Sequence, residues 1–278
     1  MNIMGLGKVG CNIADQFSEY PQYKVFKIDR NLEGTRCLKL PDMTDPELYE
    51  ELDIKSGNFL KGLKENVLFI LSGASIVSGV TLRLLQKIHE KGVSISILYI
   101  EPELELLSEK KQLQERVVRN VLQQYARSGL LEKMYLVQNQ ALDGILGEVP
   151  ILRYYETINS FLVSLVHMLN VFKNTESVTD TFSEPSDTAR ICTFGVCDSD
   201  GKNERLLYPI QEVREINYFF GIPESILETQ SNLYRSIVDM VKSKITSRLR
   251  ASYGIYKTSY EEILTYGLYY SSQIQEKI

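Results

Sequence analysis

The chain has 278 residues, of which 44% are hydrophobic and 24% charged, enough for one large α/β domain or for such a domain with a smaller second one. The formal net charge of −5 argues against a nucleic acid as a partner held by bulk electrostatics. Four scattered cysteines without a Cys-x-x-Cys pair, and only two histidines, argue against a zinc site and predict reduced thiols in a cytoplasmic protein.

The longest apolar stretch covers residues 161–172 and predicts a buried helix. Ser164, His167 and Asn170 interrupt it, and it is too short to span a bilayer. The first predicted strand begins at residue 2, so we expect no signal peptide. These observations predict no membrane insertion.

A Gly-x-Gly-x-x-Gly pattern, formed by Gly5, Gly7 and Gly10, lies where the first predicted strand would turn into the first helix. In such a turn the first glycine permits a tight bend, the second lets the backbone approach a ligand, and the third lets helix and strand pack closely. The amides at the helix N-terminus then face a phosphate. Asp29 ends the second predicted strand about 20 residues further on, as in dinucleotide-binding folds. The pattern predicts a phosphate-bearing ligand, with an empty structural turn as the alternative.

The first half of the chain alternates between strand-like apolar runs and helical patterns. Residues 67–71 form a continuous apolar run, which is typical of a central strand covered on both faces. Gly92 and Gly129 would end the helices that precede them. This alternation predicts a doubly wound, mostly parallel sheet. We expect strands at 2–4, 24–28, 67–71, 93–100 and 134–137, and helices at 10–19, 79–91, 106–128 and 152–172.

The composition changes after the last of these helices. Residues 173–188 are polar and predict a linker between a domain at 1–172 and a small α+β domain at 189–278. Within the second domain Lys242, Lys244, Arg248 and Arg250 form a basic cluster, which suits a solvated helix end or the contact for an acidic partner or neighbouring subunit. We expect strands at 191–196, 252–257 and 264–271, and helices at 209–220 and 230–243.

The order of these elements resembles the tubulin/FtsZ superfamily, well over residues 1–172 and loosely over the remainder. The loop from Gly5 to Asn12 is similar to the family's first phosphate loop, which also ends in Gly-Asn. The resemblance implies a parallel-sheet nucleotide-binding domain, a central helix and a reduced C-terminal α+β domain. It also implies that Asn12 points toward the base or ribose and that Asn159 reads the guanine edge, since an amide offers both a donor and an acceptor.

The family's second phosphate signature, Gly-Gly-Gly-Thr-Gly-Thr-Gly, corresponds here to Ser-Gly-Ala-Ser-Ile-Val-Ser-Gly at residues 72–79. This loop keeps the first and last glycines, but it is shorter and lacks the central ones. The family's acidic Asn-x-Asp-x-x-Asp loop after the central helix is missing, because Asn174, Glu176 and Asp180 have the wrong spacing. The residues that the resemblance places at the nucleotide are Gly5, Gly7, Lys8, Gly10, Cys11, Asn12, Gly73, Ala74, Ser75, Ser78, Gly79 and Asn159.

The resemblance thus implies a protein that binds GTP or GDP, with or without magnesium, and self-associates, with GTP hydrolysis weak or lost. No catalytic residue stands out. Two alternatives stay open. The glycine pattern and Asp29 also suit an NAD(P)-dependent oxidoreductase, although no Tyr-x-x-x-Lys or His/Asp pair is evident. The shortened loop at 72–79 suits a non-catalytic interaction protein that keeps the fold without a nucleotide.

Overall fold

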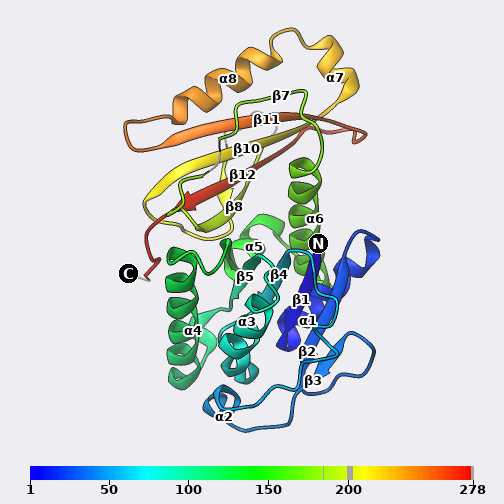
Figure 1. Ribbon diagram of the computed structural model, residues 1–278. Helices are drawn as coiled ribbons and strands as arrows, with labels where there is room; N and C mark the ends of the chain where they lie inside the picture. The colour runs from blue at the N-terminus through cyan, green and yellow to red at the C-terminus, as the bar shows by residue number, and fades with distance from the viewer. Residues whose placement is uncertain (184, 199–202, 277–278) are drawn as a thin grey trace. The chain divides into compact units, whose positions relative to one another are not determined.

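A computed structural model describes residues 1–183, 185–198 and 203–276 (Figure 1). The chain forms two compact units, 1–163 and 164–278, and the division falls within helix α6 (Tyr154–Lys173). The predicted domain limits at 172 and 189 stay a prediction, and Glu184 of the predicted linker lies outside the described residues.

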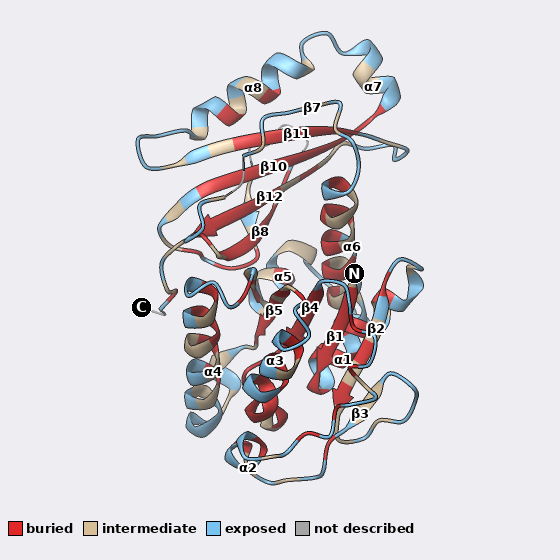
Figure 2. Ribbon diagram, in the orientation of Figure 1, coloured by how far each residue is buried: buried red, intermediate tan, exposed pale blue. Residues whose placement is uncertain are grey.

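Six parallel strands form the sheet in the described part of the first unit, in the order β3-β2-β1-β4-β5-β6. The central strands β1 and β4 are buried along their whole length, as Figure 2 shows, because helices cover both faces of a parallel sheet. The strands are β1 (Asn2–Leu6), β2 (Lys24–Asp29), β3 (Cys37–Lys39), β4 (Val67–Leu71), β5 (Ile95–Glu101) and β6 (Lys133–Gln138).

Each of the helices α1 to α5 of this unit follows one of its strands along the chain. Helix α1 packs against β1, β2 and β4, while α4 and α5 contact β6. Gly92 and Gly129 follow α3 and α4 with positive φ angles of 70° and 85°, which confirms them as the predicted helix ends. Helix α1 begins at Gly7 rather than at residue 10, and α5 has no counterpart in the sequence prediction. The helices are α1 (Gly7–Gln16), α2 (Pro46–Glu50), α3 (Thr81–His89), α4 (Glu109–Arg127) and α5 (Asn139–Leu146).

The second unit is built on a mixed sheet, in the order β8-β12-β10-β11-β7, with β9 paired to β8. Strands β10 and β11 run parallel, and the other described pairs are antiparallel. The elements are β7 (Thr179–Asp180), β8 (Ile191–Cys197), β9 (Arg205–Leu206), β10 (Val213–Pro223), α7 (Glu224–Thr229), α8 (Leu233–Lys244), β11 (Arg250–Thr258) and β12 (Leu264–Ser271).

The helix predicted at 209–220 is wrong, because residues 213–220 lie in strand β10 and residues 209–212 precede it without forming a helix. This strand lies between β12 and β11, and the side chains from Glu215 to Pro223 are all buried. A strand buried on both faces is apolar at successive positions and does not alternate between apolar and polar residues. Its hydrophobic pattern therefore does not distinguish it from a buried helix. The aromatic residues of Tyr218–Phe220 favour the strand.

Aromatic rings fill the core of the second unit. Phe172, near the end of α6, stacks on Tyr256 with ring centroids 4.7 Å apart and on Phe219 at 6.4 Å. Phe182 adds a further ring against Phe219 at 4.9 Å. These contacts attach the C-terminal half of α6 to strands β10 and β11.

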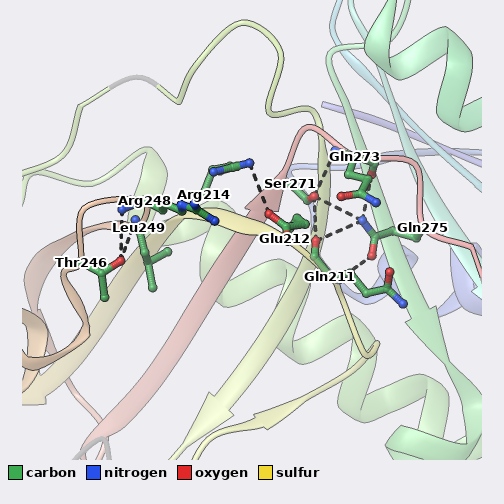
Figure 3. A network of polar contacts seen from close by, with 9 residues as sticks. All are labelled: Gln211, Glu212, Arg214, Thr246, Arg248, Leu249, Ser271, Gln273 and Gln275. Carbon is green, nitrogen blue, oxygen red and sulfur yellow. Dashed lines mark hydrogen bonds and ion pairs between the residues drawn. The ribbon is translucent and has the colours of Figure 1, made fainter.

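The segment after β12 is fixed by Gln275, whose side chain is buried (Figure 3). Gln275 Oε1 accepts a 2.6 Å hydrogen bond from the backbone N–H of Gln211, just before β10. Its Nε2 donates to the Gln273 carbonyl at 2.8 Å, and Ser271 Oγ donates to the Gln211 carbonyl at 2.8 Å. One amide side chain thus closes the C-terminal segment onto the sheet.

Candidate functional site

The first loop joins β1 to α1 with very little space between backbones. A Cβ atom on Gly5 would lie 2.2 Å from the Gly10 carbonyl oxygen, and one on Gly10 would lie 2.3 Å from the Ile70 carbonyl oxygen. These two glycines let α1 press against β1 and β4. Gly7 has a φ angle of +69°, which favours glycine, and it is the first residue of α1.

The second loop, residues 72–79, follows β4 and is held by its own polar groups. Ser78 Oγ donates a 2.8 Å hydrogen bond to the Gly73 carbonyl and accepts one of 2.9 Å from Gln114 Nε2. Gln114 Nε2 also lies 2.6 Å from the Ser75 carbonyl oxygen. The loop is therefore tied to α4 through Gln114.

The two loops meet at Gly7. Since β1 and β4 are parallel neighbours, the loops that follow them lie at the same edge of the sheet. A Cβ atom on Gly7 would lie 3.0 Å from Ser75 Oγ and 3.0 Å from Val77 Cγ2, and Val77 is buried. The side chains of Ser75 and Val77 thus cover the position that Gly7 keeps open.

Gly73 and Gly79 of the second loop allow close packing. A Cβ atom on Gly73 would lie 2.1 Å from the Tyr99 hydroxyl, and one on Gly79 would lie 2.0 Å from the Pro46 carbonyl oxygen. Close packing alone therefore explains why glycine occupies the two positions that this loop shares with the family signature.

A buried ionic cluster lies beneath Gly73, and no motif in the sequence predicts it. Glu115 Oε1 accepts hydrogen bonds from the Tyr99 hydroxyl at 3.0 Å and from Arg119 Nε at 2.9 Å. Arg119 Nε is also 3.6 Å from Glu101 Oε2, and Gln138 Nε2 donates to Glu101 Oε1 at 2.6 Å. Glu115 and Arg119 lie one turn apart on α4, and that polar spacing is the one signal that the sequence carries.

Burial controls the protonation of this cluster. Desolvation raises the pKa of Glu115, while the Arg119 guanidinium opposes the rise. Burial, together with the neighbouring Glu115, raises the pKa of Tyr99 well above its ordinary value. The Tyr99 hydroxyl therefore stays protonated and donates to Glu115, which holds α4 against β5 below the second loop.

Cys11 takes part in packing. Its Sγ donates to the carbonyls of Gly5 at 3.4 Å and Ile28 at 3.6 Å, and burial raises the pKa of the thiol to about 12. Lys8 and Asn12, by contrast, are exposed and lie one turn apart on α1.

Asn159 lies half-buried on α6, in the first unit. Gln16 Nε2, one turn beyond Asn12, donates to the Glu156 carbonyl at 3.4 Å, so the end of α1 lies beside the start of α6. Ala74 and Ser75 are half-buried in the second loop. The structure thus brings Gly7 and Ser75 together and places the α1 face beside α6, whereas Gly10, Cys11 and Gly79 face the protein.

Of the two acidic residues that follow α6 in this region, Glu176 is exposed outside any strand and Asp180 is part of the second sheet. Asp180 lies in β7, where it pairs with Gly254 of β11, and its carboxylate accepts a hydrogen bond from Ser177. Asn174 Nδ2 donates to the Asn170 carbonyl at 2.7 Å. Within the described ranges, no three His, Cys, Asp or Glu residues are grouped as a metal site, and no helix is long and apolar enough to cross a membrane.

Comparison with known proteins gives no match to a family model or to a curated protein. Solved structures do match. An FtsZ dimer of M. jannaschii has a TM-score of 0.70 at 13% identity over 98% of this chain and 88% of its own. GDP-form TubZ protofilaments of Bacillus thuringiensis serovar israelensis give 0.71 at 14% identity over 96% and 83%. The GTPγS-bound protofilament of CetZ2 from Haloferax volcanii gives 0.69 at 13% identity over 97% and 92%. The predicted fold class is confirmed: the chain has the tubulin/FtsZ fold.

Proposed function

We propose that this chain is a cytoplasmic, tubulin-like protein that binds GTP or GDP at its first two loops and self-associates, with GTP hydrolysis weak or lost. The observation that carries the proposal is the meeting of the two loops at Gly7, after neighbouring parallel strands. Ligands of α/β sheets bind at this edge, and the N-terminus of α1 favours a phosphate there. TubZ and CetZ2, which share the fold, form nucleotide-bound protofilaments.

The proposed positions of the guanine base and of the phosphates differ in how well the surrounding residues fit them. Lys8 and Asn12 are exposed on α1, and Asn159 lies on α6, which α1 contacts through Gln16 and Glu156. A phosphate that reaches the Gly7 amide would require Ser75 and Val77 to move, because their side chains cover Gly7. The residues present therefore fit the base better than the phosphates. A magnesium ion takes oxygen ligands, and the Ser75 hydroxyl is one of that type.

Weak or absent hydrolysis follows from the segment after α6. A water that attacks the γ-phosphate needs a group to position it. Asp180, one of the two acids in the region of the family's missing pattern, is held in the β7–β11 pair. We assign no catalytic residue.

A second candidate function is an interaction protein that keeps the fold without nucleotide. The hydrogen bonds that Ser78 and Gln114 donate favour this function, because they pair polar groups of the second loop, which a nucleotide would otherwise bind, with other protein groups. The oxidoreductase alternative loses support because the match to the tubulin/FtsZ fold covers nearly the whole chain.

Equilibrium binding of fluorescent GDP and ADP tests the proposal. We expect GDP to bind more tightly than ADP, and Asn159→Ala to weaken GDP binding about tenfold, the effect of one lost hydrogen bond. Asn170→Ala, an amide removed elsewhere on the same helix, is the control. Equal binding of GDP and ADP would refute the guanine contact, and no binding of either would favour the second candidate.

A further inference from the structure

We propose that the turn between α8 and β11 docks onto an acidic segment of a second copy of this chain. The inference rests on the self-association proposed above and names the two surfaces that meet. The basic turn is residues 242–250, and the acidic segment is residues 42–53. The two surfaces match in the sign of their charges and in the exposed aliphatic side chain that each presents.

The basic turn concentrates positive charge on a protein whose net charge is −5. Residues 240–260 contain no acid. Lys244 pairs with Glu204 at 2.8 Å, but Lys242, Arg248 and Arg250 are exposed and form no ion pair within the described parts of the chain. Ile245 lies among them with 49% of its surface exposed.

Hydrogen bonds fix the shape of this turn. Thr246 Oγ1 accepts the backbone N–H groups of Arg248 at 3.2 Å and Leu249 at 3.1 Å (Figure 3). The Thr246 N–H donates to the Leu249 carbonyl at 3.0 Å. The cations and Ile245 are therefore presented on an ordered turn, so binding costs less conformational entropy.

The acidic segment has the opposite composition. Residues 40–54 contain no Lys, Arg or His, and six acids lie between 42 and 53. Asp42 pairs with Arg30 at 2.7 Å and Asp45 with Lys110 at 2.6 Å. Glu50, Glu51 and Asp53 are exposed and, among the residues described, have no ion-pair partner. Leu48 of α2 is 48% exposed in their midst.

The two surfaces are complementary in charge and in pattern. Each carries one exposed aliphatic side chain, Ile245 or Leu48, within charges of one sign. Single exposed ion pairs contribute little, but opposite patches speed encounter and fix the register. Because the surfaces differ, their contact is heterologous and can repeat from copy to copy, which gives a chain of subunits.

Sedimentation velocity of the purified full chain tests the contact through two charge reversals. One variant carries Glu50→Lys with Glu51→Lys, and the other carries Lys242→Glu with Arg248→Glu. We expect wild type to associate at about 0.05 M salt and less at about 0.5 M, where screening is stronger. Each variant alone should stay monomeric, because its two surfaces now repel. An equimolar mixture of the two should associate again, since each positive surface meets a negative one.

Lys91→Glu with Arg127→Glu is the matched control, because both residues are exposed and the charge change equals that of the second variant. The control should associate like wild type, and circular dichroism checks that every variant is folded. Wild-type association of both reversed variants, or failure of the mixture, would overturn this contact while leaving self-association in place. A wild-type chain that stays monomeric in both salts, with and without GTP, would overturn the contact and the proposed assembly together.

Discussion

Val77 Cγ2 lies 3.0 Å from the position that a Cβ atom on Gly7 would take, so a buried aliphatic side chain of the second loop covers the most open glycine of the first. In the proposed site, a phosphate at the Gly7 amide competes with Val77 for this space. The contact therefore links loop packing to nucleotide affinity, and it makes both measurable.

Truncation of Val77 should change protein stability and GDP affinity in opposite directions. We expect Val77→Ala to lower the free energy of unfolding by about 2 kcal/mol, because a buried side chain is lost, and to raise the affinity for GDP, because the space over Gly7 opens. Val80→Ala is the control, since Val80 is also buried in the short helix Ile76–Val80. Urea unfolding and GDP titration measure the pair. Lower GDP affinity in Val77→Ala would contradict the competition.

A side chain at position 7 should lower the free energy of unfolding by more than the positive φ angle alone explains. Gly7 and Gly92 have nearly equal φ angles, +69° and +70°, but a Cβ atom on Gly92 would meet nothing within 4 Å. We expect Gly92→Ala to cost about 1–2 kcal/mol and Gly7→Ala to cost more and to abolish GDP binding. Denaturant titration of both variants gives the difference, and equal costs would show that the loop contact adds nothing.

The buried cluster should depend on Arg119. Arg119→Met leaves Glu115 and Glu101 without their cation, and we expect a loss of about 3–5 kcal/mol in the free energy of unfolding. Arg116→Met, on the exposed side of the same helix, should change it by less than about 0.5 kcal/mol. A similar small change in Arg119→Met would mean that the cluster does not stabilise α4.

Glu115 should make stability depend on pH. Burial raises its pKa in the folded protein above the ordinary 4.5, so the stability from this shift is present below about pH 4.5 and is lost as pH rises through the folded pKa. Glu115→Gln does not titrate. We therefore expect the unfolding free energy of wild type to fall relative to Glu115→Gln as pH rises from acid to neutral. The opposite slope would show that Arg119 outweighs burial.

The sequence predicts the features that depend on local chemistry. The glycine turn after β1, the apolar strand β4 and the helix ends at Gly92 and Gly129 were all predictable from residue type and spacing. Strand β10 was not predictable, because a strand buried on both faces lacks the alternating hydrophobic pattern that identifies a strand. The Tyr99–Glu115 hydrogen bond and the Gly7–Val77 contact join residues that are far apart in sequence, and only the folded chain brings them together.

The thermal stability of the purified chain with GTP, GDP, ATP and NAD, each with and without magnesium, shows whether the chain binds a guanine nucleotide. A ligand that binds only the folded state adds about 2.7 kcal/mol at a hundredfold excess over its dissociation constant. If the chain binds guanine nucleotides as proposed, we expect a higher Tm with GTP and GDP and no change with ATP or NAD. An unchanged Tm with guanine nucleotides, or a rise with NAD alone, would contradict the proposed binding.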